Sequence, residues 1–483
     1  MEEKDIKTWD RGVIPVWLSV LLCAAAFISL TFNNNVWLDE AFTGSLVNTD
    51  MAGVIRRSMA DTLPPLYNII LRLTTLAFSY SVPVMKLTSA APMIFTLILG
   101  ATVVRKRFGN LCACIFILAI TVMPQMMFFG VEIRMYSLGF FFATACGIFL
   151  YELLEKPSRL NRILFSLCGV LAGYSHHFAF VTAGFLYLFL LIYCCREHKR
   201  YSKDKDRELH PILLPDFLKC LCLTFILYFP CLLVTLKQLK SVSGYFSMPR
   251  VTIPVFIKYC RYPFTVGSTP LSIALLLLTA FLFLSLIFRK EKTLKDMFSF
   301  WCFITFYLVL IFGTAVSAVM TANIFVDRYL FFALGLIWLF FSIEASRLKP
   351  AFVCLVIALE LAVGTFSYVQ AFVSEYAPGA NETISWLAAN VSEGDSLYTL
   401  EEYEELAYCL TFYDNRLTNY ETLDEAVKAA GDNDIWVAVL DGYEGSEGYG
   451  KAMDGIAGEG YSLDYEGTFR FDRYMYKMYK IIR

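Results

Sequence analysis

Long apolar runs recur along this chain of 483 residues, and they limit the folds open to it. A run of about 20 apolar residues spans the hydrocarbon core of a bilayer. Hydrophobic residues make up 57% of the sequence, against about 45–50% in soluble domains. The sequence therefore predicts a polytopic α-helical membrane protein with about eleven transmembrane helices. The candidate spans lie near residues 13–32, 82–104, 111–129, 137–154, 163–174, 179–195, 217–236, 271–288, 297–320, 329–343 and 351–371.

The distribution of charge predicts which loops face the cytoplasm. Lysines and arginines gather in alternate loops, at residues 105–107, 156–162, 196–207, 289–295 and 347–349. By the positive-inside rule these loops and the N-terminus are cytoplasmic. An odd number of spans then places the tail outside, where residues 373–483 hold 22 acidic and 8 basic residues. We expect a multi-pass protein of a cell membrane whose first external loop contains Asp39 and Glu40.

Composition divides the chain into a transmembrane domain, residues 1–372, and a small extracytoplasmic α/β domain, residues 373–483. The tail has helical patterns at residues 381–391 and 402–413 and strand patterns at 434–440 and 467–479.

Two external segments are too distinctive to be plain connectors. In the first external loop, residues 33–81, the stretch "DTLPPLYNIILRLTTLAF" predicts a helix along the membrane surface, with Asp61 or Thr62 at its N-cap. The second segment, residues 237–264, mixes basic residues with aromatic residues and prolines. We expect it to be a mobile loop over a site.

Ionisable residues cluster near the outer ends of the predicted spans. Polar groups at such a depth usually face a cavity or the interior of the bundle, because lipid offers them no partner. The predicted topology puts all of them on one side, which favours a single shared site. They are Asp39 and Glu40, Asp61, Glu132 and Arg134, His176 and His177, and Asp327 and Arg328.

Each of these groups also has a structural explanation. External acids are most often solvated or cap a helix, as Asp61 can. Glu132 and Arg134 can pair with neighbouring helices, the histidines can be satisfied by local hydrogen bonds, and Arg328 can reach the headgroups. Their joint occurrence on one face is the argument for function.

The chemistry that fits such a face is glycosyl transfer from a lipid phosphate. A lipid tail stays in the bilayer while a sugar phosphate head rests at the interface. Transfer needs a base for the incoming hydroxyl and positive charge for the departing phosphate. A carboxylate can be the base, and arginine suits a phosphate because it forms bidentate contacts. One carboxylate suffices for a single inverting displacement.

Five motifs together resemble a known superfamily. "WLDEAFT", "DTLPPLYNIILRL", "GVEIRMYSLGFF", "GYSHHFAF" and "DRYLFFALGL" occur in the order seen in the GT-C integral-membrane glycosyltransferases. The likeness covers residues 10–372 and is nearest to the bacterial branch similar to protein O-mannosyltransferases and lipid A aminoarabinose transferases. It implies a polyprenyl-phosphate sugar donor, used at the outer face of the cytoplasmic membrane. The acceptor hydroxyl would belong to a cell-envelope glycan, a glycolipid or a protein.

The resemblance also implies roles for individual residues. Asp39 would be the catalytic base, with Glu40 beside it in the site. The residues expected to bind substrate are Asp61, Tyr67, Glu132, Arg134, Tyr136, His176, His177, Arg328 and Tyr329, with Arg328 on the donor phosphate.

The chain departs from the family pattern in informative ways. Leu63 stands where many relatives have a histidine, so that role is lost or has moved to His176 or His177. The WWDYG signature of oligosaccharyltransferases is absent, as is any D-x-D motif or Cys/His cluster with metal-ligand spacing. We therefore assign no metal or other cofactor and expect no nucleic-acid partner. The alternatives are a polysaccharide polymerase or ligase, and a transporter of a lipid-linked solute; transporters commonly show internal repeats, which are not evident here.

Overall fold

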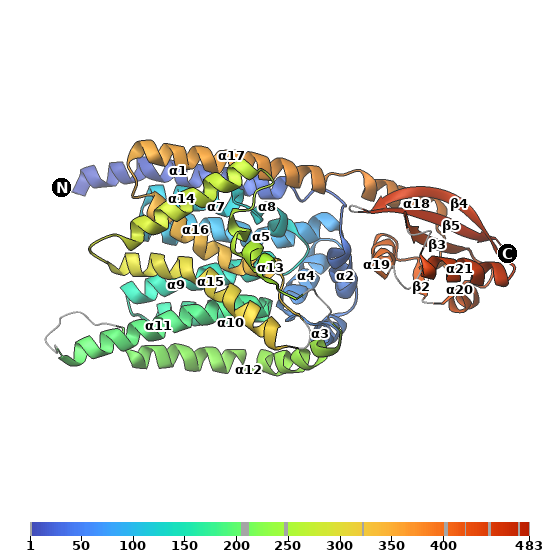
Figure 1. The fold of residues 1–483 in the computed structure, drawn as a ribbon, viewed down its shortest axis with the longest axis horizontal. Helices are drawn as coiled ribbons and strands as arrows, with labels where there is room; N and C mark the ends of the chain where they lie inside the picture. The colour runs from blue at the N-terminus through green and yellow to red at the C-terminus, as the bar shows by residue number, and fades with distance from the viewer. Residues whose placement is uncertain are drawn as a thin grey trace. The chain divides into compact units, whose positions relative to one another are not determined.

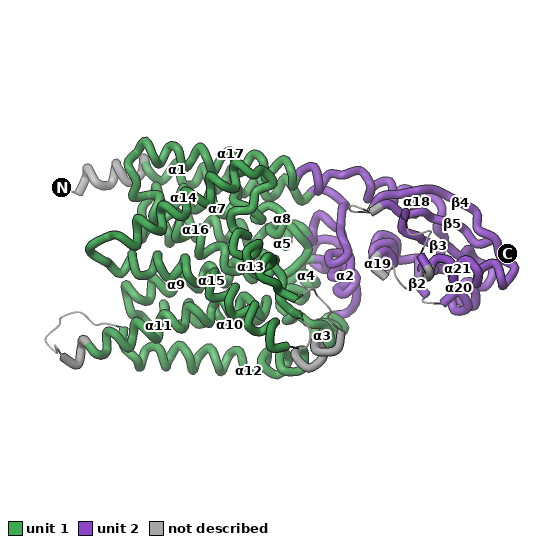
Figure 2. Tube along the Cα trace, viewed as in Figure 1, with its two compact units in different colours: residues 1–31, 51–74, 86–371 green, residues 32–50, 75–85, 372–483 purple. Residues whose placement is uncertain are grey.

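The computed structural model describes residues 2–203, 212–245, 250–320, 323–399, 404–420, 422–442, 446–471 and 474–482. These residues form two compact units (Figure 2). Unit 1 comprises Met1–Thr31, Met51–Thr74 and Lys86–Ala371, and unit 2 comprises Phe32–Asp50, Thr75–Met85 and Phe372–Arg483. Parts of three predicted segments, residues 204–207, 246–249 and 402–403, lie outside the described residues.

Unit 1 is a bundle of long apolar helices (Figure 1), which confirms the predicted polytopic membrane fold. Among the described residues, 9 helical segments are long and apolar enough to cross a membrane. They are formed by α1 (Glu2–Ser29), α5 to α6 (Val82–Phe108, through the π-helical turn η1, Gly100–Val104), α9 (Tyr136–Glu155), α11 (His177–Lys203), α12 (Leu214–Tyr245), α14 (Thr269–Ile287), α15 (Leu294–Val319), η3 with α16 (Asp327–Leu330 and Phe331–Ala345), and α17 (Pro350–Glu375).

The other helices of unit 1 are shorter. Two of them, α7 (Asn110–Val122) and α10 (Arg159–Ser175), fall on the two remaining predicted spans. The rest are α3 (Met51–Ala60), α4 (Leu66–Ala77), α8 (Met126–Val131), α13 (Ile253–Cys260) and the 3-10 turn η2 (Tyr262–Phe264).

Helix α16 is the core of unit 1. All of its residues from Phe331 to Ala345 are buried, and it packs against α7, α9 and α15. Apart from Ser342 and Glu344, the helix is apolar on every side and has no polar face to give to solvent, so burial on every side is the expected outcome. The outer helices α1, α12 and α14 instead expose large apolar side chains, which suits helices surrounded by lipid.

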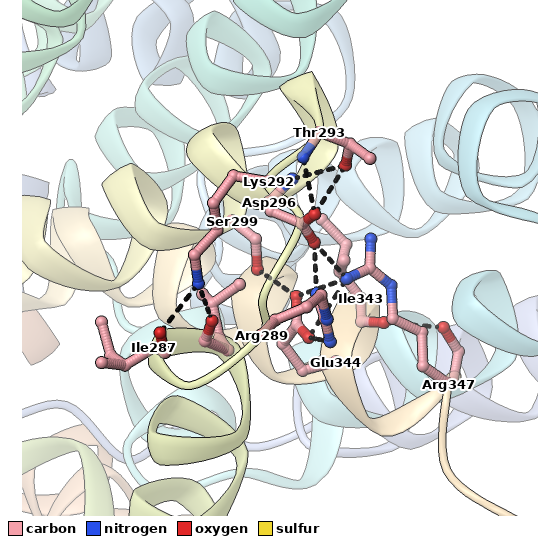
Figure 3. Close-up of polar contacts among 11 residues, drawn as sticks. Ile287, Arg289, Lys292, Thr293, Asp296, Ser299, Ile343, Glu344 and Arg347 are labelled. Carbon is pink, nitrogen blue, oxygen red and sulfur yellow. Dashed lines mark hydrogen bonds and ion pairs between the residues drawn. The ribbon is translucent and has the colours of Figure 1, made fainter.

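A network of ion pairs joins α15 and α16 at one end of the bundle (Figure 3). Asp296 accepts from Arg289 and from Arg347, the latter at 2.5 Å. Glu344 accepts from Arg289 at 2.8 Å and from the Ser299 hydroxyl at 2.8 Å. Because both carboxylates are only 2% exposed, their charges depend on these partners.

The surface helix predicted in the first external loop is α4, but its start differs from the prediction. Helix α4 begins at Leu66, after Pro64 and Pro65, so neither Asp61 nor Thr62 is its N-cap. Two prolines lack the N–H groups that a helix needs beyond its first turn, and the helix starts once they are passed. The Asp61 carboxylate instead accepts the backbone N–H of Thr62 at 2.6 Å.

Unit 2 contains the predicted α/β domain, built on a five-stranded sheet with the order β2-β1-β3-β5-β4. Strand β1 (Ser396–Thr399) is parallel to β2 (Thr418–Tyr420) and β3 (Ile435–Leu440), whereas β5 (Tyr474–Ile482) runs antiparallel to β3 and β4 (Ser462–Phe471). The apolar run of β3 is buried at the centre, as its sequence pattern predicts. The helices are α18 (Gly379–Asn390), α19 (Glu404–Tyr413), α20 (Leu423–Ala430) and α21 (Glu447–Gly458).

The start of the loop of residues 33–81 also belongs to unit 2, which the sequence did not predict. Helix α2 (Leu38–Val47) packs against α19. Just before α2, the Asn35 amide donates to the carbonyls of Glu375 and Ala377, each at 2.7 Å. These bonds attach the loop to the segment that leads into the C-terminal domain.

The ion-pair network makes a stability prediction. Replacing Glu344 with alanine removes its bonds to Arg289 and Ser299, although Arg289 keeps Asp296, so we expect a loss of about 1.5–3 kcal/mol in the free energy of unfolding. The matched control is Glu291→Ala, since Glu291 is an exposed acid in the neighbouring loop. Thermal unfolding of the purified protein in detergent should show a much lower Tm for Glu344→Ala only; equal Tm values for both variants would contradict the role given to the network.

Candidate functional site

Unit 1 contains a group of buried and half-buried polar side chains drawn from interruptions between helices, which we call the buried polar cluster. Glu132, Arg134 and Tyr136 come from the connection between α8 and α9 and from the start of α9. The other members are His176 between α10 and α11, Tyr262 in η2, and Arg328 and Tyr329 in η3. Six of these seven residues are sequence-predicted site residues, and the fold brings them together.

The contacts of His176 and Tyr136 define the cluster. The His176 ring packs on Tyr329 with 4.7 Å between ring centroids and on Phe332 with 4.4 Å. Arg134 and Arg328 lie near enough to act electrostatically on both His176 and Tyr136, and Glu132 acts on Tyr136.

Local backbone geometry explains why these residues share one place. Helix α8 ends at Val131, and the Arg134 N–H donates to the Glu132 carbonyl at 2.6 Å in a tight turn before α9. Further along α9, Gly139 lets the helix approach Phe332, because a Cβ at this position would lie 2.6 Å from the Phe332 ring. Phe332 in turn supports the His176 ring.

The surroundings of His176 determine its protonation. Burial, together with the charges of His177, Arg134 and Arg328, holds the pKa of His176 well below its usual range, so the ring is neutral. Its Nδ1 accepts the Phe178 N–H at 3.0 Å. The single ring proton is therefore on Nε2, which makes that atom a hydrogen-bond donor.

Three buried polar atoms of the cluster have no hydrogen-bond partner in the described part of the chain: His176 Nε2, Tyr136 Oη and Tyr262 Oη. Buried polar atoms are nearly always bonded, because leaving one unpaired costs about 1–3 kcal/mol. Two arginines and three unpaired polar atoms that can donate form a suitable environment for an anion such as a phosphate.

Tyr262 is a member that sequence reasoning missed. It lies within segment 237–264, which was expected to be external and to cover a site, and it is electrostatically close to Asp327, Tyr136 and Arg328. An uncharged tyrosine in an aromatic stretch gives no sequence signal of its own. The position of the segment near the predicted site was the available clue.

Three other predicted residues have structural contacts in unit 1. The His177 Nε2 lies 3.3 Å from the Thr62 carbonyl oxygen, and Gln238 donates to the Leu63 carbonyl at 2.9 Å. These contacts hold the loop that contains Asp61. Tyr67 is buried, and its hydroxyl forms a hydrogen bond with the Ser89 hydroxyl at 2.6 Å. This contact stabilises the packing of α4 against α5.

Asp327, adjacent to Arg328, takes part in two local interactions. Its carboxylate accepts the backbone N–H of Arg328 at 3.0 Å and pairs with Lys258 at 3.3 Å. These contacts connect η3 to α13 and so help to fix the backbone from which Arg328 and Tyr329 project.

The two predicted catalytic carboxylates lie in unit 2 and differ in their surroundings. Glu40 is buried, and its carboxylate accepts the Trp37 N–H at 3.1 Å at the start of α2. Asp39 is half-buried in the same first turn. Glu40 thus stabilises the helix N-terminus, a capping role. A catalytic role for Asp39, and its meeting with the cluster in one site, stay predictions.

The unpaired hydroxyl of Tyr262 leads to a prediction. Removing a buried hydroxyl that lacks a partner should not weaken the ligand-free protein, so Tyr262→Phe should unfold at the same Tm or higher. A matched change, Tyr67→Phe, breaks the bond to Ser89 and should lower Tm by the equivalent of about 1 kcal/mol. A clear loss of Tm in Tyr262→Phe would show that this hydroxyl is already bonded within the protein.

Comparison with known proteins identifies the fold. No protein-family model matches the sequence, and no curated protein matches it. Among solved structures, ArnT from Cupriavidus metallidurans, bound to undecaprenyl phosphate, superposes with a TM-score of 0.63 at 11% identity, covering 96% of this chain and 97% of that chain.

Two further structures are similar. The oligosaccharyltransferase of Archaeoglobus fulgidus in its apo form has a TM-score of 0.51 at 11% identity, covering 94% of this chain and 74% of its own. The arabinofuranosyltransferase AftD from Mycobacteria has a TM-score of 0.52 at 12% identity, covering 95% of this chain and 39% of its own. Over nearly its whole length, this chain therefore has the fold of the GT-C glycosyltransferases.

Proposed function

We propose that this protein is a membrane glycosyltransferase that moves a sugar from a polyprenyl-phosphate donor to an acceptor hydroxyl at the outer face of the cytoplasmic membrane. The observation that carries the proposal is the buried polar cluster, with two arginines beside three unpaired polar atoms. The likeness to ArnT, whose structure holds undecaprenyl phosphate, supports it. The alternation of basic and non-basic loops supports the outer face.

The formal charge of the cluster suits this donor. Arg134 and Arg328 contribute two positive charges and Glu132 one negative charge, while His176 is neutral. A polyprenyl-phosphate sugar is a phosphodiester with one negative charge, which this net charge balances. When the sugar leaves, the phosphate gains a second negative charge. The arginines and the Nε2–H of His176 then stabilise the product side of the reaction more than the substrate side.

The acceptor half of the reaction needs a base. Asp39 would take the proton from the acceptor hydroxyl while that oxygen forms a bond to the anomeric carbon. The bond from the anomeric carbon to the phosphate oxygen breaks, and its electron pair leaves with the polyprenyl phosphate. This single displacement inverts the anomeric configuration and uses one carboxylate, which leaves Glu40 free to cap α2.

Replacing the base tests the catalytic role. Asp39→Asn keeps the size and removes the proton acceptor, so turnover should fall by about 10²–10⁴-fold. The measurement is transfer from a labelled polyprenyl-phosphate sugar by the purified protein, in parallel with donor binding, which should not change. Asp50→Asn, which alters an exposed carboxylate of the same unit, is the control. Turnover by Asp39→Asn at the level of the control excludes Asp39 as the base.

Replacing an arginine tests the donor site. Arg328→Gln removes a charge-assisted contact worth about 1.5–3 kcal/mol, so affinity for undecaprenyl phosphate should fall by at least tenfold. The control is Arg261→Gln, because Arg261 is an exposed arginine directly before Tyr262. Titration with undecaprenyl phosphate in detergent gives both affinities. If Arg328→Gln binds undecaprenyl phosphate as tightly as the wild type, the donor phosphate binds elsewhere. In a separate assay, uptake of a labelled lipid-linked solute without sugar transfer would favour a transporter.

A further inference from the structure

Unit 2 contains a cavity of about 680 Å³, a size typical of small-molecule sites. Its walls come from the end of α2, the turn before α5, α18, and the end of α19 with the residues that follow it. None of the described residues that line it carries a charge. The lining instead combines amides and hydroxyls with aromatic rings, including Asn48, Asn415, Tyr80 and Phe412.

The walls of the cavity are held in place by hydrogen bonds and close packing. The Tyr80 hydroxyl donates to the Gly44 carbonyl at 2.9 Å, and its ring lies 6.1 Å from that of Phe412. Gly44 is required for this packing, because a Cβ there would lie 2.3 Å from the Phe412 ring. The Tyr413 hydroxyl donates to the Asn34 carbonyl at 3.2 Å. A wall that is ordered in advance reduces the entropy lost when a ligand binds.

The chemistry of the lining selects one class of ligand. A phosphorylated or carboxylated group would enter without a cation to balance it, at a cost in desolvation. A neutral saccharide offers hydroxyls to the amides and the apolar faces of its rings to Tyr80 and Phe412. From these observations we propose that the cavity binds a neutral saccharide and, given the proposed function, that this saccharide is part of the acceptor.

Helix α2 contributes both Asp39 and one wall of the cavity. Asp39 lies in the first turn of α2, and the cavity residue Ser45 lies six positions later on the same helix. Six residues of helix rise about 9 Å. Six residues also turn by about 600°, so Ser45 and Asp39 lie on different faces of the helix, and a saccharide held at the end of α2 would have to extend both along and around it to present a hydroxyl group to Asp39. The same short helix would fix both the base and the acceptor.

The test measures saccharide binding without any donor. The full-length protein in nanodiscs is titrated with three neutral tetrasaccharides, chitotetraose, mannotetraose and maltotetraose. An anionic saccharide, tetragalacturonic acid, and a serine-rich peptide are titrated in the same way. Saturation-transfer NMR measures the binding of each ligand. The variant is Asn48→Ala/Asn415→Ala, which shortens two exposed lining side chains and so spares the core. Asn390→Ala, an exposed asparagine of the same unit that does not line the cavity, is the control.

We expect at least one neutral tetrasaccharide to bind, and the double variant to weaken its affinity by about tenfold or more, since each hydrogen bond contributes about 1 kcal/mol. In the transfer assay, that variant should raise KM for the acceptor and leave kcat and donor affinity unchanged. Preferential binding of the anionic saccharide or of the peptide overturns the inference. Equal affinity of the wild type, the double variant and Asn390→Ala for the neutral saccharide overturns it as well. Saccharide binding that is lost in the double variant supports the cavity even if no transfer occurs, and absent transfer then counts against the proposed function alone.

Discussion

Hydrocarbon offers no hydrogen bonds, and this constraint decides where unit 1 can hold polar chemistry. A spanning helix satisfies its own backbone, so its middle can be wholly apolar, as α16 is. Single buried polar side chains do occur within helices, as at Thr144 and Glu360, but the polar side chains that gather in one cluster lie where helices start or stop. Each member of the buried polar cluster comes from such a place, in the connections before α9, α11 and α14 and at η3. Three atoms of the cluster have no partner in the described part of the chain, and their grouping beside two arginines is the basis of the proposed phosphate site.

Helix α16 links the cluster to the rest of the bundle. Its first turn follows Arg328 and Tyr329 directly, and its last turn contains Glu344 in the ion-pair network (Figure 3). The helix is buried throughout, so neither end can shift without disturbing its neighbours. Contacts at the Glu344 end therefore help to fix the register of the backbone that presents Arg328, although the two ends are about 22 Å apart by helical rise.

The sequence predicted well whatever depends on composition and period. Apolar runs located the helices of unit 1, and the strand predicted at residues 434–440 was confirmed as the buried central strand β3. The sequence-based prediction failed where local backbone chemistry decides the outcome. The prolines moved the start of α4 away from Asp61, so the predicted N-cap was wrong. Tyr262 was missed because its importance comes from being buried without a partner, which only a three-dimensional arrangement reveals.

Because Asn35 forms hydrogen bonds with Glu375 and Ala377, the C-terminal domain cannot be separated from the start of the loop that contains α2. A cut after α17 would leave every candidate membrane span in place, but it would also remove the contacts that support α2, the helix that contains Asp39. Exchanging C-terminal domains between relatives would have the same effect unless residues 32–50 and 75–85 were exchanged with them. Unit 2 is therefore one structural unit built from three separate stretches of sequence. We expect substitutions in residues 32–50, 75–85 and the C-terminal domain to be correlated among relatives.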